Sequence, residues 1–162
     1  MERRNMRVME EFFDTKLTDV IETNGNQEEY FICIFQKLKE QGYVQDSFLL
    51  AITNREKDYP TGLKTQFMGI AIPHTEPQHI KKPFIYLTKL KTPIEFGQMG
   101  SCDEYVQVRY IFVLGFDKGD QQLVLLKNLM AMFADESTMN KLSQDITADE
   151  MYQLVTQYFK NR

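Results

Sequence analysis

The segment Val106-Gln-Val-Arg-Tyr-Ile-Phe-Val-Leu-Gly-Phe116 is the longest strand candidate in the chain. Its inner part, Tyr110 to Leu114, is apolar at every position, so both faces of the strand would be apolar. A strand of this kind is typical of the centre of a sheet that is covered by other elements on both sides. The segment therefore predicts an α/β fold with a buried central strand.

Other strands and helices are predicted on either side of this segment. The strand candidates are the apolar run Phe67–Ile72, Phe84–Leu90 after Pro83, and a short piece at Ile94–Phe96. Apolar residues at helical spacing predict helices over 30–38, 47–58, 120–133, 136–143 and 147–159. In the helix over 120–133, spacings of 3, 4 and 3 predict this buried face: Leu123, Leu126, Met130 and Phe133.

The order of these elements indicates one domain with a mixed sheet of about five strands, covered by helices on both faces. A length of 162 residues also fits a single domain. We expect residues 1–13 to form a mobile N-terminal arm and residues 14–162 to form the domain. Thr147 and Glu150 are expected to cap the last helix as a capping box.

Composition excludes several classes of protein. Hydrophobic residues make up 43% and charged residues 26%, as in an ordinary folded domain and unlike a disordered chain. The formal net charge of −4 argues against a nucleic-acid binder. Two cysteines, Cys33 and Cys102, are too few for a disulfide scaffold or a four-cysteine zinc site, so we expect reduced thiols. The sequence shows no signal peptide and no apolar run of membrane-spanning length, so we expect a cytoplasmic protein.

The first candidate site residue is His74, one of two histidines. It directly follows the predicted strand ending Gly69-Ile-Ala-Ile-Pro73, and ligands of open α/β sheets bind at the carboxyl ends of strands. Pro73 fixes its own backbone φ and so restricts the backbone that carries His74. A neutral imidazole at this place is a nucleophile or base. A surface histidine without a role remains the alternative.

The second histidine, His79, lies five residues further on. A metal site formed by His74, Glu76 and His79 is conceivable, but the spacing suits no common helix pair and Pro77 intervenes.

The second candidate segment is Asn54-Arg-Glu-Lys-Asp-Tyr-Pro-Thr-Gly62, which ends a predicted helix. Arg55 could hold a phosphoryl group through two oxygens. Thr61 offers a hydroxyl, and a turn at Gly62 would let backbone amides approach an anion. The alternative is a charged helix end followed by a stop signal, which is common.

Several known motifs do not occur in the sequence: the P-loop, the dinucleotide fingerprint, C-x-x-C, H-E-x-x-H and G-x-S-x-G. Nucleotide-dependent and zinc-protease chemistries therefore have no support.

Together, the segments 54–63 and 69–75 resemble the enzyme IIA component of the bacterial phosphoenolpyruvate-dependent sugar phosphotransferase system. The resemblance is to the fructose–mannitol–nitrogen superfamily and extends from about Asp14 to about Tyr158. Within it, the segments 71–79 and 120–126 look most like the galactitol-type proteins. Mannitol and fructose relatives carry a second active-site histidine at the position of Gln122. A glutamine donates a hydrogen bond but carries no proton at neutral pH, and His79 is a possible helper instead.

The resemblance implies a phosphoryl relay. His74 would accept a phosphoryl group from the phosphocarrier protein HPr and pass it to enzyme IIB, and membrane enzyme IIC would deliver the sugar. Arg55 matches the family's active-site arginine. The family favours Nε2 as the phosphorylated nitrogen, with Nδ1 oriented by a carbonyl or side chain.

The relay would need no metal or other cofactor, and we expect a monomer. Nitrogen-type relatives use the phosphorylation state to regulate other proteins, which is the alternative function. Glu76 would repel a phosphoryl group if it pointed at His74. We therefore expect it to face away or to pair with Lys81 or Lys82.

Overall fold

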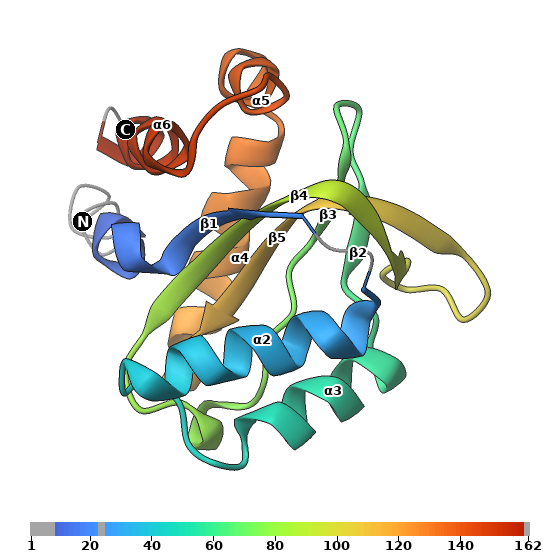
Figure 1. Cartoon of the computed structure of the whole chain (residues 1–162), viewed down its shortest axis with the longest axis vertical. Helices are drawn as coiled ribbons and strands as arrows, with labels where there is room; N and C mark the ends of the chain where they lie inside the picture. The colour runs from blue at the N-terminus through green and yellow to red at the C-terminus, as the bar shows by residue number, and fades with distance from the viewer. Residues whose placement is uncertain (1–8, 23–24, 161–162) are drawn as a thin grey trace.

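The computed structural model describes residues 9–22 and 25–160 and contains a five-stranded sheet (Figure 1). The strand order is β1-β4-β5-β3-β2, and the strands are β1 (Thr18–Ile21), β2 (Gly62–Lys64), β3 (Gly69–Ala71), β4 (Phe84–Gly97) and β5 (Tyr105–Gly115). The central strand β5 runs parallel to β3 and antiparallel to β4. β1 is parallel to β4, and β2 is antiparallel to β3. The predicted mixed sheet is confirmed.

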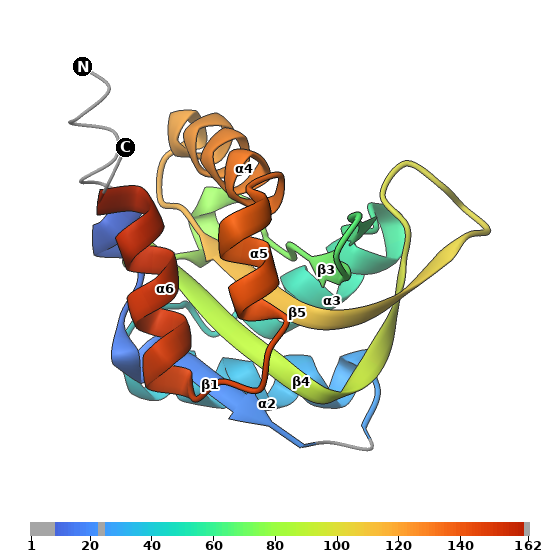
Figure 2. The ribbon, with the colours of Figure 1, turned by 90° about the horizontal axis from the view of Figure 1, so that it is seen from above.

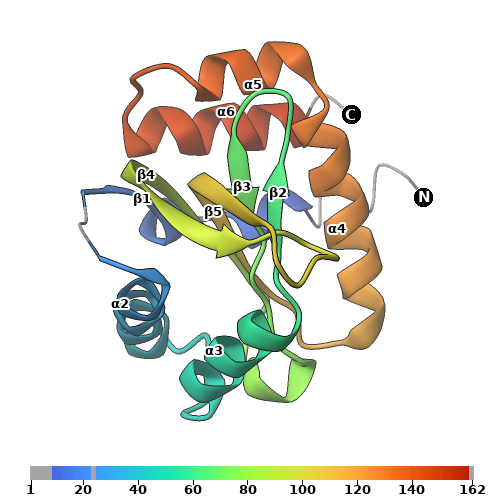
Figure 3. The same ribbon diagram turned by 90° about the vertical axis from the view of Figure 1, so that its right-hand side faces the viewer.

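Helices cover both faces of this sheet. α2 (Gln27–Glu40) and α3 (Phe48–Asp58) lie on one face, and α4 (Gly119–Phe133), α5 (Glu136–Leu142) and α6 (Ala148–Lys160) lie on the other (Figures 1 and 2). Figure 3 shows the strands between the two helical layers. Successive residues of β5 point to opposite faces, so Tyr110, Phe112 and Leu114 join one core and Ile111 and Val113 the other. The two-sided apolarity of β5 therefore follows from its central place.

Helix ends are set by local hydrogen bonds. The Asn26 side chain accepts from the Glu29 N–H at 3.0 Å and begins α2. Gly42 follows its end with a φ of +80°, the left-handed conformation that glycine adopts without strain. The predicted capping box of α6 is confirmed, because the Glu150 N–H donates to Thr147 Oγ1 and the Thr147 N–H donates to Glu150 Oε1, each at 3.1 Å.

Two strand predictions change. The candidates at 84–90 and 94–96 form one strand, β4, whose register with β5 shifts between Lys89 and Ile94. β1 and β2 were not predicted because they are only four and three residues long, which is too short for a clear alternating pattern.

The predicted N-terminal arm is wrong for residues 9–13. Met9, Phe12 and Phe13 are buried in the core, and Phe13 stacks on Phe159 of α6 at 5.9 Å. These side chains cover α6 and the sheet, so the domain includes residues from Met9 onward. Residues 1–8 of the predicted arm lie outside the described residues.

The predicted buried face of α4 is also partly wrong. Leu123 is 76% exposed and Met130 is exposed as well. The buried residues of α4 are Leu125, Leu129, Met132 and Phe133. Because this helix is apolar at most positions from 123 onward, more than one face fits helical spacing, and packing against the sheet decides between them.

Candidate functional site

His74 is held at the carboxyl end of β3. The carbonyl of Pro73 accepts from the Leu114 N–H of β5 at 2.9 Å, which ties the residue before His74 to the central strand. His74 is only 7% exposed, and its ring lies against Phe116, with 5.9 Å between centroids. Because β3 and β5 are parallel, the segments that follow them meet at one edge of the sheet. The sequence prediction of a histidine on a rigid mount at this edge agrees with that placement.

The hydrogen bond of His74 fixes its tautomer. Nδ1 lies 2.8 Å from the carbonyl oxygen of Ile72. A carbonyl oxygen only accepts, so Nδ1 carries the proton and the neutral ring keeps its lone pair on Nε2. Burial lowers the pKa of His74, opposed by the Ile72 bond; the Arg55 cation lowers it further and Glu76 raises it. At neutral pH the ring is therefore uncharged, with Nε2 as its nucleophilic atom.

Gln122 lies next to this reactive nitrogen. It belongs to the first turn of α4, which follows β5 at the same edge of the sheet, and its Nε2 donates toward His74 Nε2 at 3.4 Å. The positive end of a helix dipole favours negative charge nearby. The site thus offers an amide donor and a helix N-terminus on the side of the lone pair.

Arg55, in the last turn of α3, pairs with Glu76. Its Nη1 lies 2.5 Å from Glu76 Oε1, and its guanidinium lies 5.3 Å from the ring centroid of Tyr59. The expected pairing of Glu76 with Lys81 or Lys82 is therefore wrong. The planar fork of arginine matches a carboxylate better than an ammonium does, and Lys82 instead lies over the ring of Tyr43.

Thr61 does not hold a free hydroxyl for an anion. Its N–H and its hydroxyl donate to the two carboxylate oxygens of Glu56 at 2.7 and 2.8 Å, which closes the turn after α3. Glu56 is only 4% exposed, and burial raises its pKa to about 7 despite the two Thr61 bonds and the nearby Arg55. In this arrangement Thr61 shapes the loop beside Arg55, and its role as a hydrogen-bond donor to a phosphoryl group stays a prediction.

Gly62 has a steric role that the turn prediction missed. It begins β2, and a Cβ there would lie 2.5 Å from the carbonyl oxygen of Gly97. The glycine is needed because two backbones approach closely, rather than for a turn around an anion.

His79 contacts α3 rather than the reactive nitrogen of His74. Its Nδ1 shares a hydrogen bond of 2.7 Å with the Ser47 hydroxyl, at the start of α3. Glu76 meets Arg55 at the other end of the same helix. The loop after His74 therefore contacts both ends of α3, the start through His79 and the last turn through Glu76.

The structure thus brings His74 and Gln122 together and places Arg55 in the same electrostatic environment. The sequence reasoning did not identify Glu56, Ser47 or the packing of Phe116. Glu56 lies inside the quoted 54–62 segment, so a glutamate next to a candidate arginine was an available signal. The contact between Ser47 and His79 spans 32 positions and leaves no local pattern.

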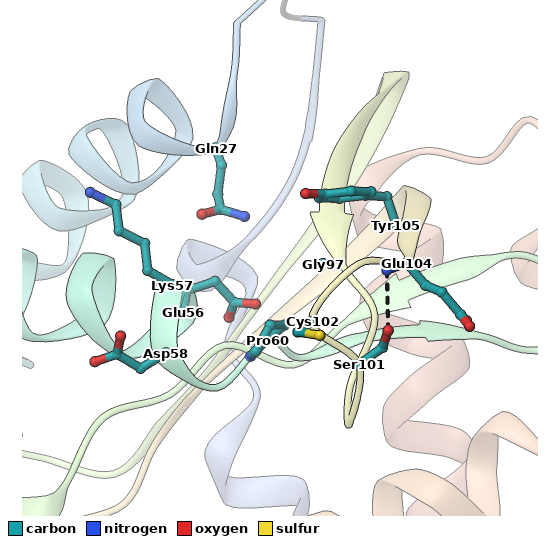
Figure 4. Close-up of a pocket in the computed structure, with 10 residues that line it drawn as sticks. All are labelled: Gln27, Glu56, Lys57, Asp58, Pro60, Gly97, Ser101, Cys102, Glu104 and Tyr105. Atoms are coloured by element: carbon teal, nitrogen blue, oxygen red, sulfur yellow. Dashed lines mark hydrogen bonds between the residues drawn. The ribbon is translucent and has the colours of Figure 1, made fainter.

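A cavity of about 380 Å³ lies beside Glu56 (Figure 4). Glu56 and Pro60 line it opposite the loop 101–105, in which the Glu104 N–H donates to Ser101 Oγ at 3.1 Å. Its lining includes none of the five predicted site residues, so it does not form part of the His74 site.

Within 9–22 and 25–160, no three His, Cys, Asp or Glu side chains converge as metal ligands would. No helix in that part of the chain has the length and apolar character needed to cross a bilayer.

Residues 11–158 match the family described as phosphoenolpyruvate-dependent sugar phosphotransferase system, EIIA 2. The chain belongs to this family. It is 34% identical over 96 residues to the galactitol-specific EIIA component of Escherichia coli K12, covering 59% of this chain and 63% of that protein. The match thus spans less than two thirds of the galactitol-specific relative. The mannitol-specific enzyme IIA component of Mycoplasma pneumoniae is 30% identical over 139 residues, covering 82% of this chain and 89% of that protein.

Solved structures share the fold. The mannitol-specific cryptic enzyme IIA CmtB of Escherichia coli superposes with a TM-score of 0.73 at 17% identity, over 91% of this chain and 97% of that one. The nitrogen regulatory protein IIA-Ntr of Neisseria meningitidis gives 0.72 at 22% identity, over 91% and 99%. Enzyme IIAMTL of Escherichia coli, in complex with phosphorylated enzyme IIBMTL, gives 0.63 at 20% identity, over 85% and 99%.

Proposed function

We propose that this chain is a cytoplasmic phosphocarrier of a sugar phosphotransferase system, with His74 as the phosphoryl acceptor. The observation that carries the proposal is the bond from His74 Nδ1 to the Ile72 carbonyl, which leaves the lone pair on Nε2. A buried neutral imidazole is ready to attack phosphorus without first losing a proton.

The transfer balances without a metal or an added base. The Nε2 lone pair of His74 forms a bond to phosphorus, while the bond between phosphorus and the donor histidine of phospho-HPr breaks and its electron pair returns to the donor ring. The proton on Nδ1 stays in its hydrogen bond with the Ile72 carbonyl. The same chemistry in reverse passes the group to an acceptor on enzyme IIB, and membrane enzyme IIC then takes part indirectly.

Charge develops on the three equatorial oxygens of the moving phosphoryl group, so fixed donors and a cation supply most of the catalysis. Gln122 supplies an N–H beside His74 Nε2, and Arg55 supplies the cation. His79 and Thr61 act through the loops that they hold. We assign His79 to anchoring the loop after His74, through Ser47.

The sugar is proposed to be a sugar alcohol such as galactitol, because the galactitol-specific relative shares 34% identity over 96 residues. Enzyme IIB is the proposed acceptor because a IIA structure with this fold was solved with its phosphorylated IIB partner. We propose a monomer that meets both partners briefly.

A second candidate function is a regulatory module whose His74 phosphorylation state controls a protein partner. The likeness in fold to a nitrogen regulatory IIA protein supports this second candidate.

The test is phosphorylation by phosphoenolpyruvate, enzyme I and HPr, read by intact mass, followed by addition of a galactitol-type IIB. Wild type should gain one acid-labile phosphoryl group and lose it to IIB. His74→Gln should gain none, and His79→Gln should still be labelled. No label on wild type would overturn the proposal, whereas a label that IIB cannot remove would favour the regulatory function.

A further inference from the structure

Arg55, the cation beside His74, already forms an ion pair in the unmodified protein. Arg55 donates to the Glu76 carboxylate at 2.5 Å. Glu76 lies two residues after His74, and both Arg55 and Glu76 alter the pKa of His74, in opposite directions. A phosphoryl group on His74 Nε2 would therefore compete with Glu76 for the same guanidinium.

The burial of the two partners indicates which of them can move. The Glu76 side chain is 50% exposed, whereas that of Arg55 is 26% exposed and rests against Tyr59. A half-exposed carboxylate can turn to water at little cost, because exposed ion pairs contribute little to stability. Arg55 is the fixed partner and Glu76 is the replaceable one.

Arg55 also has an unused donor. Its Nε is buried and has no hydrogen-bond partner among the described residues. A buried donor without an acceptor is unfavourable, and a phosphoryl group has three oxygens that can accept from a guanidinium fork. The present arrangement satisfies Arg55 only in part.

From these contacts we propose that Glu76 is an internal counter-ion that occupies Arg55 while His74 is unmodified and is displaced toward solvent when His74 is phosphorylated. This inference rests on the proposed function. Each phosphorylation then includes the loss of the Arg55–Glu76 ion pair. Arg55 therefore stabilises the phosphohistidine less than it would if it had no carboxylate partner beforehand. Glu76 thus acts as a positioning residue, through Arg55, and keeps the phosphoryl group transferable.

The experiment measures the equilibrium between phospho-HPr and this protein by intact mass. Glu76→Gln keeps the shape of the side chain and removes its charge, and we expect it to shift the equilibrium about threefold toward the phosphorylated chain, in keeping with the small contribution of a partly exposed ion pair. The matched control is Glu40→Gln, an exposed glutamate at the end of α2, which should leave the equilibrium unchanged.

An Arg55→Gln background separates competition from simple repulsion. If Glu76 acts by occupying Arg55, the effect of Glu76→Gln should largely disappear there; if it persists in full, the counter-ion role is wrong. In unmodified protein, Glu76→Gln should also lower the pKa of His74, measured by NMR titration, which reports on the folded site independently of transfer.

The possible failures are distinguishable. No phosphorylation of wild type would overturn the proposed function and this inference with it. Phosphorylation of wild type with an unchanged equilibrium in Glu76→Gln, or with an equal shift in Glu40→Gln, would overturn this inference alone.

Discussion

At the scale of single residues, two buried ionisable groups lie in or beside the candidate site, and burial shifts their pKa values in opposite directions. His74 is kept neutral by burial, with its proton held by a backbone carbonyl. Glu56 is buried beside Arg55 in the chain, and its pKa is raised to about 7. Both groups give the protein a pH dependence that can be measured directly.

We expect the pKa of His74 to lie below 6.5, because its charged form would be desolvated. The chain has only two histidines, so His79→Gln leaves a single imidazole for an unambiguous NMR titration. A midpoint at or above 6.5 would contradict the burial of His74 as described. Wild type provides the control for any effect of the substitution on the fold.

Glu56 should make the protein less stable as pH rises from about 4.5 to about 7. In this window the native protein holds a proton on Glu56 that the unfolded chain has already lost. The difference amounts to about 3 kcal/mol at most. Urea unfolding across this range should show the loss in wild type and a smaller one in Glu56→Gln. His74 makes the free energy of unfolding rise with pH below 6.5, but it does so equally in wild type and in Glu56→Gln. Parallel plots of unfolding free energy against pH for the two proteins would therefore refute the raised pKa of Glu56.

The sequence predicts the candidate site residues better than it predicts their partners. Arg55 and His74 lie in segments with a recognisable pattern, and the position of His74 after a strand could be argued from Pro73 and Gly69 alone. The partners of these residues could not. Whether Glu76 meets a lysine or Arg55 depends on how α3 packs beside the loop, which no local spacing records.

At the scale of elements, β3 is the mount of His74 and is only three residues long. Gly69 begins it, and a Cβ there would lie 2.1 Å from the carbonyl oxygen of Gln107 on β5. The glycine in the Gly69–Thr75 segment therefore reflects a close backbone approach between parallel strands.

Gly69→Ala should destabilise the protein by about 2 kcal/mol or more, because the contacted atom is backbone and cannot move aside. Thermal unfolding measures the change. Gly119→Ala is the matched control, since a Cβ at the start of α4 meets nothing within 4 Å. Equal stability of the two variants would show that the β3–β5 contact is looser than described.

Elements differ in how well the sequence predicts them. The caps of α6 follow from side chains three residues apart, and the central strand β5 follows from its composition. The buried face of α4 was predicted only in part because its apolar residues surround much of the helix. β1 depends on pairing with the distant strand β4, and β2 is only three residues long, so their sequences alone carry little signal.

At the scale of the whole molecule, two cores flank one sheet, and among the described residues Met9, Phe12 and Phe13 already belong to one of them. Phe13 packs against Phe159 from the last helix, so the start and the end of the described chain stabilise each other. The contact joins residues 146 positions apart, so no local pattern around Phe13 predicts it.

Phe13→Ala should cost about 3 kcal/mol of unfolding free energy, as for a buried aromatic side chain. The control is Tyr105→Ala, an aromatic that is 64% exposed, for which we expect a change within about 0.5 kcal/mol. Denaturant unfolding compares the two. Equal small losses would restore the predicted boundary at residue 14.

We propose that His74 accepts a phosphoryl group on Nε2 while Nδ1 keeps its proton. The most direct test is ¹⁵N and ³¹P NMR of the ¹⁵N-labelled protein after phosphorylation by phosphoenolpyruvate, enzyme I and HPr. We expect one phosphohistidine, at His74, with phosphorus coupled to Nε2 and the Nδ1 proton still present. Phosphorus on Nδ1, on His79, or on no histidine at all would contradict it.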